Sequence, residues 1–401
     1  MRDFLPRAAA RRLSLASRLS RVFEAWGYAR IITPVFECAD VLERGLGGDA
    51  RAAAIRFVEP GTGEVVALRP DITAQVARLV ATRLSDHEGP VRLCYEGAVY
   101  RLSGRLADEM GQREIIQAGI ELIDMAAPAG DAEVLAVAAA ALASASLTET
   151  RLDVGHVAPL RYVLGAVPEA MRDDLARALA KKERARLKVL AAQCSPELAP
   201  LVEALGSLWG AAGPTLERAV ALPWPEEVRS ALDQLRVVLA RFHELADPPA
   251  PQITIDLGDV RGFDYYTGVR FAGYAGGAPD AVLRGGRYDS LIGLYGRPAR
   301  ATGFAIDVEA LAQAQRASDQ PVPMARGVAV FGRGAPALAR ELRLRSIRAV
   351  TCAELPKQSW LASAGLDAAV MTDRGEVLRA DGTTSVVAID PDVLATFLGG
   401  S

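Results

Sequence analysis

One short stretch of the chain combines the residue types that a site for a small zwitterion needs. Arg261, Tyr265 and Tyr266 lie in the sequence RGFDYY, between strand-like apolar runs at 253–257 and 268–274. A guanidinium makes a two-pronged contact with a carboxylate, and tyrosine rings form a wall that ends in a hydroxyl. The stretch therefore predicts either a binding site for a molecule with a carboxylate or a surface turn with an ion pair.

A second stretch lies a little further along the chain. Residues 285–289 read GGRYD and open an apolar segment, and paired glycines let a backbone pass close to a ligand. RGFDYYTG followed by GGRYD resembles the two histidine-binding signatures of histidyl-tRNA synthetases. The resemblance implies that Arg261 holds the carboxylate of histidine, that Tyr266 contacts its imidazole, and that Tyr288 closes the pocket.

A third segment, residues 68–73, contains a carboxylate that could belong to the same site. Residues 68–73 read LRPDIT and precede a helical pattern, so that Asp71 and Thr73 lie at the start of a predicted helix. Both residue types favour helix capping, which is one explanation for them. The segment also resembles the LRPEGT motif of the synthetases, with Asp71 in place of the usual Glu. That resemblance implies that Asp71 and Thr73 hold the ammonium group of the ligand.

Two predicted strands, 91–101 and 113–123, carry polar residues on one face. Because side chains alternate along a strand, Gln117, Gly119 and Glu121 point the same way. A glycine between an amide and a carboxylate leaves room for a ligand, although a solvated face of an antiparallel sheet would also explain the pattern. The strands resemble motif 2 of class II aminoacyl-tRNA synthetases. The resemblance implies that Gln117 contacts the ammonium group and Glu121 the imidazole.

Two of the three residues that read ATP in the synthetases are not matched. Arg101 matches the motif 2 Arg that neutralises the α-phosphate, but Ser103 replaces the Glu that reads adenine, and Ala310 replaces the motif 3 Arg. Losing charged contacts to a nucleotide costs roughly 2–4 kcal/mol each. We therefore predict a histidine site without catalysis. Its residues are Asp71, Thr73, Arg101, Gln117, Glu121, Arg261, Tyr265, Tyr266 and Tyr288.

The remaining segments indicate how the chain is organised. We expect an α+β fold with an antiparallel sheet flanked by helices, as in class II aminoacyl-tRNA synthetases, over residues 1–320. Residues 159–247 predict a helical insertion, residues 313–324 a linker, and residues 325–401 a small α/β domain. Residues 31–37 read as a strand interrupted by a proline and resemble motif 1, which implies a homodimer through this region.

Composition limits the partners and the location of the protein. The chain has 401 residues and a net charge of −3, and residues 325–401 have nine basic and eight acidic side chains. An anticodon-binding domain needs a basic surface, so we expect no tRNA. The four Cys and three His are isolated, which predicts no metal, no cofactor and a cytoplasmic location. The apolar run at 134–147 is too short to span a bilayer, so we expect no membrane contact.

A basic run within the predicted insertion, residues 181–188, has two interpretations. It has five Lys or Arg residues among eight. The first interpretation is a solvated helix face, and the second is a surface for an acidic partner or for RNA.

A histidine pocket without ATP or tRNA sites is similar to a branch of the synthetase family, the regulatory subunits of ATP phosphoribosyltransferase. The resemblance implies a regulatory role in the first step of histidine biosynthesis, with a short catalytic subunit as partner and L-histidine as the feedback effector. Two alternatives stay open. One is an active histidyl-tRNA synthetase. The residues at positions 103 and 310 distinguish this alternative from a regulatory subunit. The other is a free-standing histidine-binding or RNA-associated adaptor.

Overall fold

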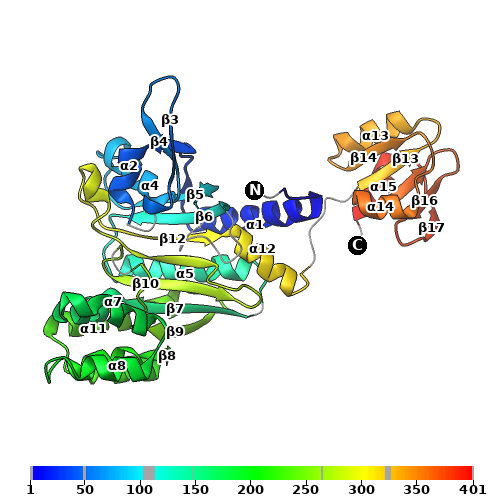
Figure 1. Ribbon diagram of the computed structural model, residues 1–401. Helices are drawn as coiled ribbons and strands as arrows, with labels where there is room; N and C mark the ends of the chain where they lie inside the picture. Colours follow the sequence, from blue (N-terminus) through cyan, green and yellow to red (C-terminus); the bar gives the residue numbers. More distant parts are fainter. Residues whose placement is uncertain are drawn as a thin grey trace. The chain divides into compact units, whose positions relative to one another are not determined.

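The computed structural model describes residues 3–47, 51–102, 113–147, 149–262, 265–320 and 327–399. The chain divides into two compact units, Met1–Gln320 and Pro321–Ser401. Figure 1 gives the labels of the helices and strands.

A nine-stranded sheet forms the centre of the first unit, with the strand order β1-β5-β6-β12-β11-β10-β7-β9-β8 (Figure 1). Neighbouring strands are antiparallel except for the pairs β1–β5 and β7–β9, which are parallel. The expected class of fold is confirmed. The strands are β1 (Ala29–Arg30), β5 (Val91–Tyr100), β6 (Glu114–Ile123), β7 (Thr150–His156), β8 (Trp209–Ala211), β9 (Gln252–Asp256), β10 (Val269–Ala275), β11 (Leu283–Arg287) and β12 (Ala301–Asp307).

One face of this sheet is covered by the helices α1 (Pro6–Ala25), α5 (Ala129–Ser144) and α12 (Val308–Ala317). Helix α1 contacts both of the others, and all three contact strands of the sheet. Helix α5 is rich in alanine and is buried on most of its surface. Small side chains let a helix and a sheet approach closely, which explains this composition. No helix within the described ranges is both long and apolar enough to cross a membrane.

The other face of the sheet carries α4 (Thr73–Arg83) and the short 3₁₀ helix η1 (Ile292–Tyr295). Helix α4 buries Ile72, Val76 and Val80 against β5 and β6, as the 3.6-residue spacing predicts. This second core also contains Tyr95 and Tyr288. The odd-numbered positions of β6 face this core, so Gln117, Gly119 and Glu121 lie on this side of the sheet.

A separate three-stranded sheet follows the first helix, with the order β2-β4-β3. Its strands are β2 (Phe36–Cys38), β3 (Ile55–Val58) and β4 (Val65–Leu68), and α2 (Ala39–Gly45) packs beside it. The predicted hairpin of β3 and β4 is confirmed. The predicted strand over 31–37, interrupted by Pro34, is confirmed only at Phe36 and Glu37, and residues 31–35 lie outside any strand. The carbonyls of Thr33 and Pro34 instead accept hydrogen bonds from the buried Arg69 guanidinium.

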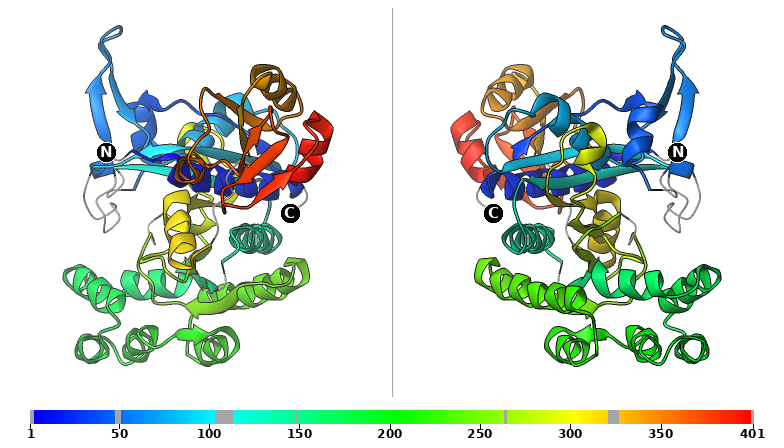
Figure 2. Two further views of the ribbon diagram at one scale, coloured as in Figure 1. Left: turned by 90° about the vertical axis from the view of Figure 1, so that its right-hand side faces the viewer. Right: turned by 90° about the vertical axis from the view of Figure 1, so that its left-hand side faces the viewer.

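The segment between β7 and β9 is mostly helical, and Figure 2 shows its helices gathered on one side of the first unit. Its strand β8 pairs with β9, so the insertion also extends the large sheet. The helices are α6 (Val157–Ala166), α7 (Glu169–Ala180), α8 (Arg184–Ala191), α9 (Ala199–Leu205), α10 (Ala212–Val220) and α11 (Glu226–Leu245).

The basic run at 181–188 lies at the junction of α7 and α8 in this insertion. Lys182 Nζ lies 2.6 Å from an oxygen of Asp256, and Arg186 forms an ion pair with Asp174. These internal acidic partners favour the interpretation of the run as a solvated, ion-paired helix face.

The second unit has a five-stranded sheet with the order β14-β13-β15-β16-β17. Its first three strands in this order are parallel and the last two are antiparallel to their neighbours. The predicted linker over 313–324 was wrong at its start, because α12 continues to Ala317. The elements are β13 (Gly327–Phe331), α13 (Ala335–Leu344), β14 (Arg348–Cys352), α14 (Gln358–Ala364), β15 (Ala368–Met371), β16 (Glu376–Arg379), β17 (Thr384–Val386) and α15 (Pro391–Gly399).

Candidate functional site

A buried carboxyl group is the centre of the site. Glu121 lies on β6 with only 1% of its surface exposed. Its Oε2 atom accepts a hydrogen bond from the hydroxyl of Tyr288, and its Oε1 atom lies 3.4 Å from the hydroxyl of Tyr95. The Thr73 side chain makes a further hydrogen bond to the same carboxyl group. Any side chain at Gly303, on the neighbouring strand β12, would collide with Oε2, so that glycine makes the niche possible.

Burial dominates the electrostatics of this group. It raises the pKa of Glu121 to about 8, against the lowering effect of the hydrogen bonds from Tyr288, Thr73 and Tyr95. The carboxylate of Asp71 acts in the same direction as burial. Burial also raises the pKa of Tyr288 and Tyr95 well above the ordinary value, so both phenols stay protonated and can donate hydrogen bonds.

Tyr95 is a residue of this site that the sequence analysis missed. It pairs with Gly119 across the β5–β6 ladder, and a β-carbon at Gly119 would lie 2.6 Å from the Tyr95 hydroxyl. The expectation that Gly119 leaves room for a ligand was therefore wrong in its detail, because a phenol of the chain itself occupies that room. A tyrosine can be predicted to lie over a glycine of the next strand only when the pairing register of the two strands is known.

Asp71 caps a helix and also acts electrostatically on the tyrosines of the site. Its Oδ1 atom accepts a hydrogen bond of 2.6 Å from the backbone N–H of Thr73, which caps the start of α4. Its charge also raises the pKa of Tyr265 and Tyr266, after burial as the larger cause. Capping therefore leaves the carboxylate close enough to the tyrosines to share their electrostatic environment.

Three tyrosines form the aromatic wall of the site. The ring centroids of Tyr265 and Tyr288 are 5.3 Å apart, and those of Tyr265 and Tyr266 are 5.2 Å apart. A β-carbon at Gly286 would lie 2.8 Å from a ring carbon of Tyr266. The second glycine of GGRYD therefore leaves space that the backbone of Val269 and Arg270 and the ring of Tyr266 occupy, and its approach to a ligand stays a prediction.

The remaining residues of GGRYD and RGFDYY have different surroundings. Arg287 is buried on the opposite side of its strand, where its Nε atom donates to Asp131 on α5 over 2.9 Å. It therefore stabilises the fold. Phe263 and Asp264 lie outside the described residues.

Gln117 and Arg101 are two further polar residues of the predicted site. Gln117 is buried, and its Oε1 atom has no hydrogen-bond partner among the described residues. Arg101 donates from Nε to the carbonyl of Pro70 over 2.9 Å, which places it next to Asp71. A buried amide oxygen without a partner is unfavourable, so Gln117 is suited to accept a hydrogen bond from a bound donor.

Arg261 is not joined to this cluster by any contact among the described residues. Its guanidinium bonds to Asp259 and to the hydroxyl of Tyr274, and lies 3.9 Å from Asp280. Contacts or electrostatic interactions thus join six of the predicted site residues: Asp71, Thr73, Glu121, Tyr265, Tyr266 and Tyr288. Gln117 lies on the same face of the sheet. Arg261 belongs to a separate network, although the backbone of its neighbour Gly262 lies against Tyr266.

The position expected to read adenine has no charged group. Ala310 lies in the first turn of α12, where its N–H donates to the Asp307 side chain over 3.0 Å and its methyl group packs against the main core. Its neighbour Glu309 forms a buried ion pair with Arg12 of α1. Ser103 and the loop 103–112 lie outside the described residues.

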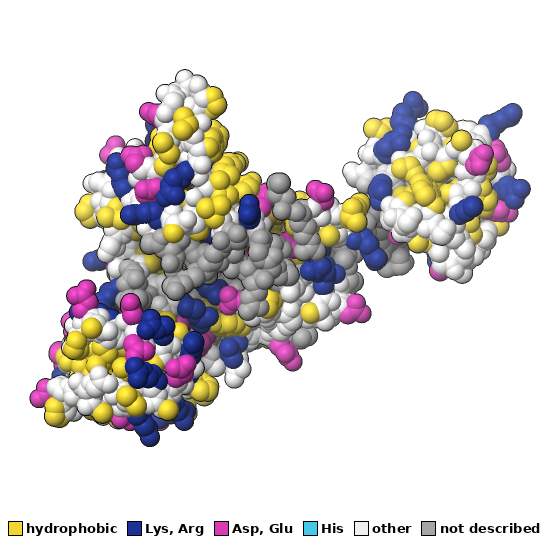
Figure 3. Space-filling view, in the orientation of Figure 1, with side chains coloured by type: hydrophobic (Ala, Val, Ile, Leu, Met, Phe, Trp, Pro, Cys, Tyr) yellow, Lys and Arg dark blue, Asp and Glu magenta, His cyan; other side chains and the backbone are white. Residues whose placement is uncertain are grey.

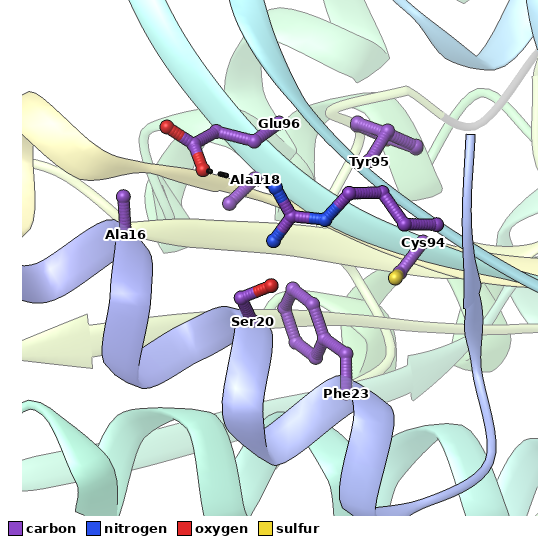
Figure 4. A pocket seen from close by; sticks show the side chains of 8 residues that line it. Ala16, Ser20, Phe23, Cys94, Tyr95, Glu96 and Ala118 are labelled. Atoms are coloured by element: carbon purple, nitrogen blue, oxygen red, sulfur yellow. Dashed lines mark ion pairs between the residues drawn. The ribbon is translucent and has the colours of Figure 1, made fainter. Parts of the chain in front are cut away.

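A small hollow lies on the other face of the sheet, between α1 and β5 (Figure 4). Ser20, Phe23 and Cys94 line it, and Glu96 lies at 4.0 Å from Arg30. None of the nine predicted site residues lines it. Within the described ranges, no group of His, Cys, Asp and Glu has the arrangement of a metal site.

Comparison with known proteins gives consistent relationships. The family model described as histidyl-tRNA synthetase matches residues 1–311. An ATP phosphoribosyltransferase regulatory subunit from Anaeromyxobacter dehalogenans is 41% identical over 319 residues, which cover 78% of this chain and 89% of that protein. One from Geobacter sulfurreducens is 38% identical over 359 residues, which cover 86% of this chain and 80% of that protein.

Solved structures agree with these sequences. An ATP phosphoribosyltransferase regulatory subunit/histidyl-tRNA synthetase from Bacillus halodurans has a TM-score of 0.79 at 28% identity, covering 92% of this chain and 96% of that one. Histidyl-tRNA synthetase from Nostoc has a TM-score of 0.80 at 20% identity, covering 99% and 97%, which shows the fold. The chain therefore belongs to the histidyl-tRNA synthetase family and, within it, to the ATP phosphoribosyltransferase regulatory subunits.

Proposed function

We propose that the protein binds free L-histidine at the Glu121 site. The partnerless oxygen of Gln117 and the carboxylate of Asp71 are suited to an ammonium group. The wall of Tyr265, Tyr266 and Tyr288 fits a small aromatic ring. The phenols beside Glu121 supply hydroxyls that can exchange hydrogen bonds with imidazole nitrogens.

We further propose that the protein is not an enzyme and that it regulates a separate short ATP phosphoribosyltransferase chain. The observation that carries this proposal is the difference between the residues expected to bind histidine and the position expected to bind ATP. The residues that would hold histidine gather around Glu121, whereas Ala310 offers only a methyl group where a synthetase needs a guanidinium. The names of the relatives support the same role.

Feedback inhibition by histidine follows from linkage. A pocket without chemistry of its own acts on a partner only if histidine binds two states of the complex unequally. A hundredfold preference for the inactive state shifts the equilibrium by about 2.7 kcal/mol. This magnitude is enough to control the first step of histidine biosynthesis, and both proteins would work in the cytoplasm.

A homodimer is the second part of the proposed assembly. Hydrophobic side chains are exposed around the motif 1 region, with Ile32 89% exposed and Phe36 49% exposed. Figure 3 shows hydrophobic side chains gathered over the β3–β4 hairpin, and Phe36 packs edge-to-face on Phe57 of β3. Burying this face against a second copy would remove an apolar surface that is otherwise a liability.

Two measurements distinguish this function from its alternatives. An active synthetase would form histidyl-tRNA from histidine, ATP and tRNA, and the proposed protein would not. A free-standing adaptor would bind histidine and leave the short catalytic chain unchanged. Co-purification with that chain, together with an assay of phosphoribosyl transfer, therefore tests the proposal.

A further inference from the structure

A network of charged side chains surrounds Arg261 and has no role in the function proposed so far. Its centre is Asp259, whose side chain is only 11% exposed. Oδ1 of Asp259 accepts hydrogen bonds from Nε and from the backbone N–H of Arg261, over 2.9 and 3.1 Å. Oδ2 accepts from Nη2 of Arg261 over 3.1 Å and from Nη1 of Arg270 over 2.8 Å.

Arg270 anchors this carboxylate to the sheet. It lies on β10 and is buried, and its Nη1 atom also donates to the carbonyl of Arg261 over 3.2 Å. Burial alone would raise the pKa of Asp259, but the charges of Arg270 and Arg261 lower it well below its ordinary range. Asp259 is therefore ionised and fixed, whereas the Arg261 side chain is 49% exposed.

A second contact fixes the same edge of the guanidinium. The Tyr274 hydroxyl accepts a hydrogen bond of 2.9 Å from Nη2 of Arg261, and the guanidinium of Arg151 lies 5.0 Å from the Tyr274 ring centre. Nε and Nη2 of Arg261 are thus occupied. Nη1 lies 3.9 Å from Asp280, which is beyond hydrogen-bond distance, and no hydrogen bond joins it to another described residue. The Nη1 end of the fork remains available to an incoming carboxylate.

We infer that Asp259 is a positioning residue: it holds Arg261 in the orientation that receives the α-carboxylate of the ligand, and so selects amino acids over amines. The inference rests on the proposed binding of histidine. An exposed arginine loses side-chain entropy when it binds, and a fixed arginine has already lost it. Fixing the guanidinium before the ligand arrives therefore favours a ligand that carries a carboxylate.

The direction in which carboxylate binding changes when Asp259 is neutralised separates a positioning role from a purely electrostatic one. If only Coulomb forces mattered, neutralising Asp259 would leave Arg261 more positive and would strengthen carboxylate binding. If positioning matters, Asp259→Asn weakens it. Histamine has the imidazole and the amino group of histidine but no carboxylate, so it reports on the rest of the pocket. The ratio of the Kd for histamine to the Kd for histidine measures the recognition of the carboxylate.

The test is isothermal titration of the full chain with histidine and with histamine. Asp259→Asn should lower the ratio of the two Kd values by about tenfold, with histamine binding unchanged. Asp259→Glu, which restores the charge, should recover part of the ratio. Asp174→Asn removes an acid of α7 that is paired with Arg186 of α8, away from this network, and should keep the wild-type ratio.

Three outcomes would overturn the inference. An unchanged or larger ratio in Asp259→Asn would show that Asp259 does not position Arg261. Equal loss of histidine and histamine binding would show a structural role only. If the wild-type chain binds no histidine, the proposed function itself is wrong and this inference is wrong with it.

Discussion

The hydroxyl of Tyr288 donates a hydrogen bond to the Glu121 carboxyl group, which lies two strands away in the large sheet. This contact joins a motif near residue 288 to a strand near residue 121, and both belong to the proposed pocket. It also places an ionisable group where water is excluded, so the protonation of Glu121 must influence stability.

The contribution of Glu121 to the stability of the fold should fall as the pH rises from about 5 to about 8. The pKa of Glu121 is about 8 in the folded chain, against 4.5 for an ordinary Glu. A raised pKa means that the folded state binds the proton of Glu121 more tightly than the unfolded state does. The stabilisation by this proton is complete below the pKa of the unfolded state and is lost as the pH rises through the pKa of the folded state.

Glu121→Gln should remove this dependence, because Gln keeps the shape and does not titrate. The free energy of unfolding of the variant relative to wild type should rise by up to about 1.4 kcal/mol per pH unit in this window. Urea unfolding at several pH values measures it. A constant difference between pH 5 and pH 8 would show that Glu121 titrates normally.

Arg261→Ala should weaken histidine binding by about 2 kcal/mol or more, because a charge-assisted contact to the carboxylate is lost. Calorimetry measures the change, and Arg229→Ala serves as the control, since Arg229 pairs with Glu226 on the insertion helix α11. Undiminished binding in Arg261→Ala would place the carboxylate elsewhere.

The purified protein should not aminoacylate tRNA or exchange pyrophosphate with ATP. Ala310 cannot stack a guanidinium on adenine, and its methyl group packs against the core. Radioactive exchange assays with histidine, ATP and tRNA check this expectation. Turnover at ordinary synthetase rates would show that the protein is an active synthetase.

Ile32→Asp should weaken self-association, because it places a charge on the exposed apolar face near Phe36. Sedimentation at micromolar concentration should show a dimer for wild type and a shift to monomer for the variant. Leu344→Asp, at an equally apolar exposed position in the second unit, should leave the dimer intact. A monomeric wild-type protein would contradict the proposed interface.

The sequence predicts the elements of this fold better than the contacts between them. The hairpin at 55–68 and the strand pair β5–β6 follow from local patterns, and both are confirmed. Residues 31–35 of the expected strand lie outside any strand, and Arg69 donates hydrogen bonds to the carbonyls of Thr33 and Pro34 there. That contact spans more than thirty residues and has no local signal.

The same limit applies to the site. The polar face of β6 follows from strand alternation, but Tyr95 reaches it only through the register that places it opposite Gly119. Asp259 lies two residues before Arg261, yet the spacing alone does not predict that its carboxylate binds Nε and Nη2 of the Arg261 guanidinium. Register and side-chain pairing depend on tertiary packing, which one sequence does not reveal.

We propose that this chain controls a separate catalytic chain through its histidine pocket. The most direct measurement is phosphoribosyl transfer by the short ATP phosphoribosyltransferase chain, alone and with this protein, at increasing histidine concentration. We predict that this protein raises the rate, that histidine lowers it again, and that Arg261→Ala and Glu121→Gln keep the activation but need much more histidine for inhibition. Equal inhibition of wild type and both variants at the same histidine concentration would contradict this account, because the effector would then bind elsewhere.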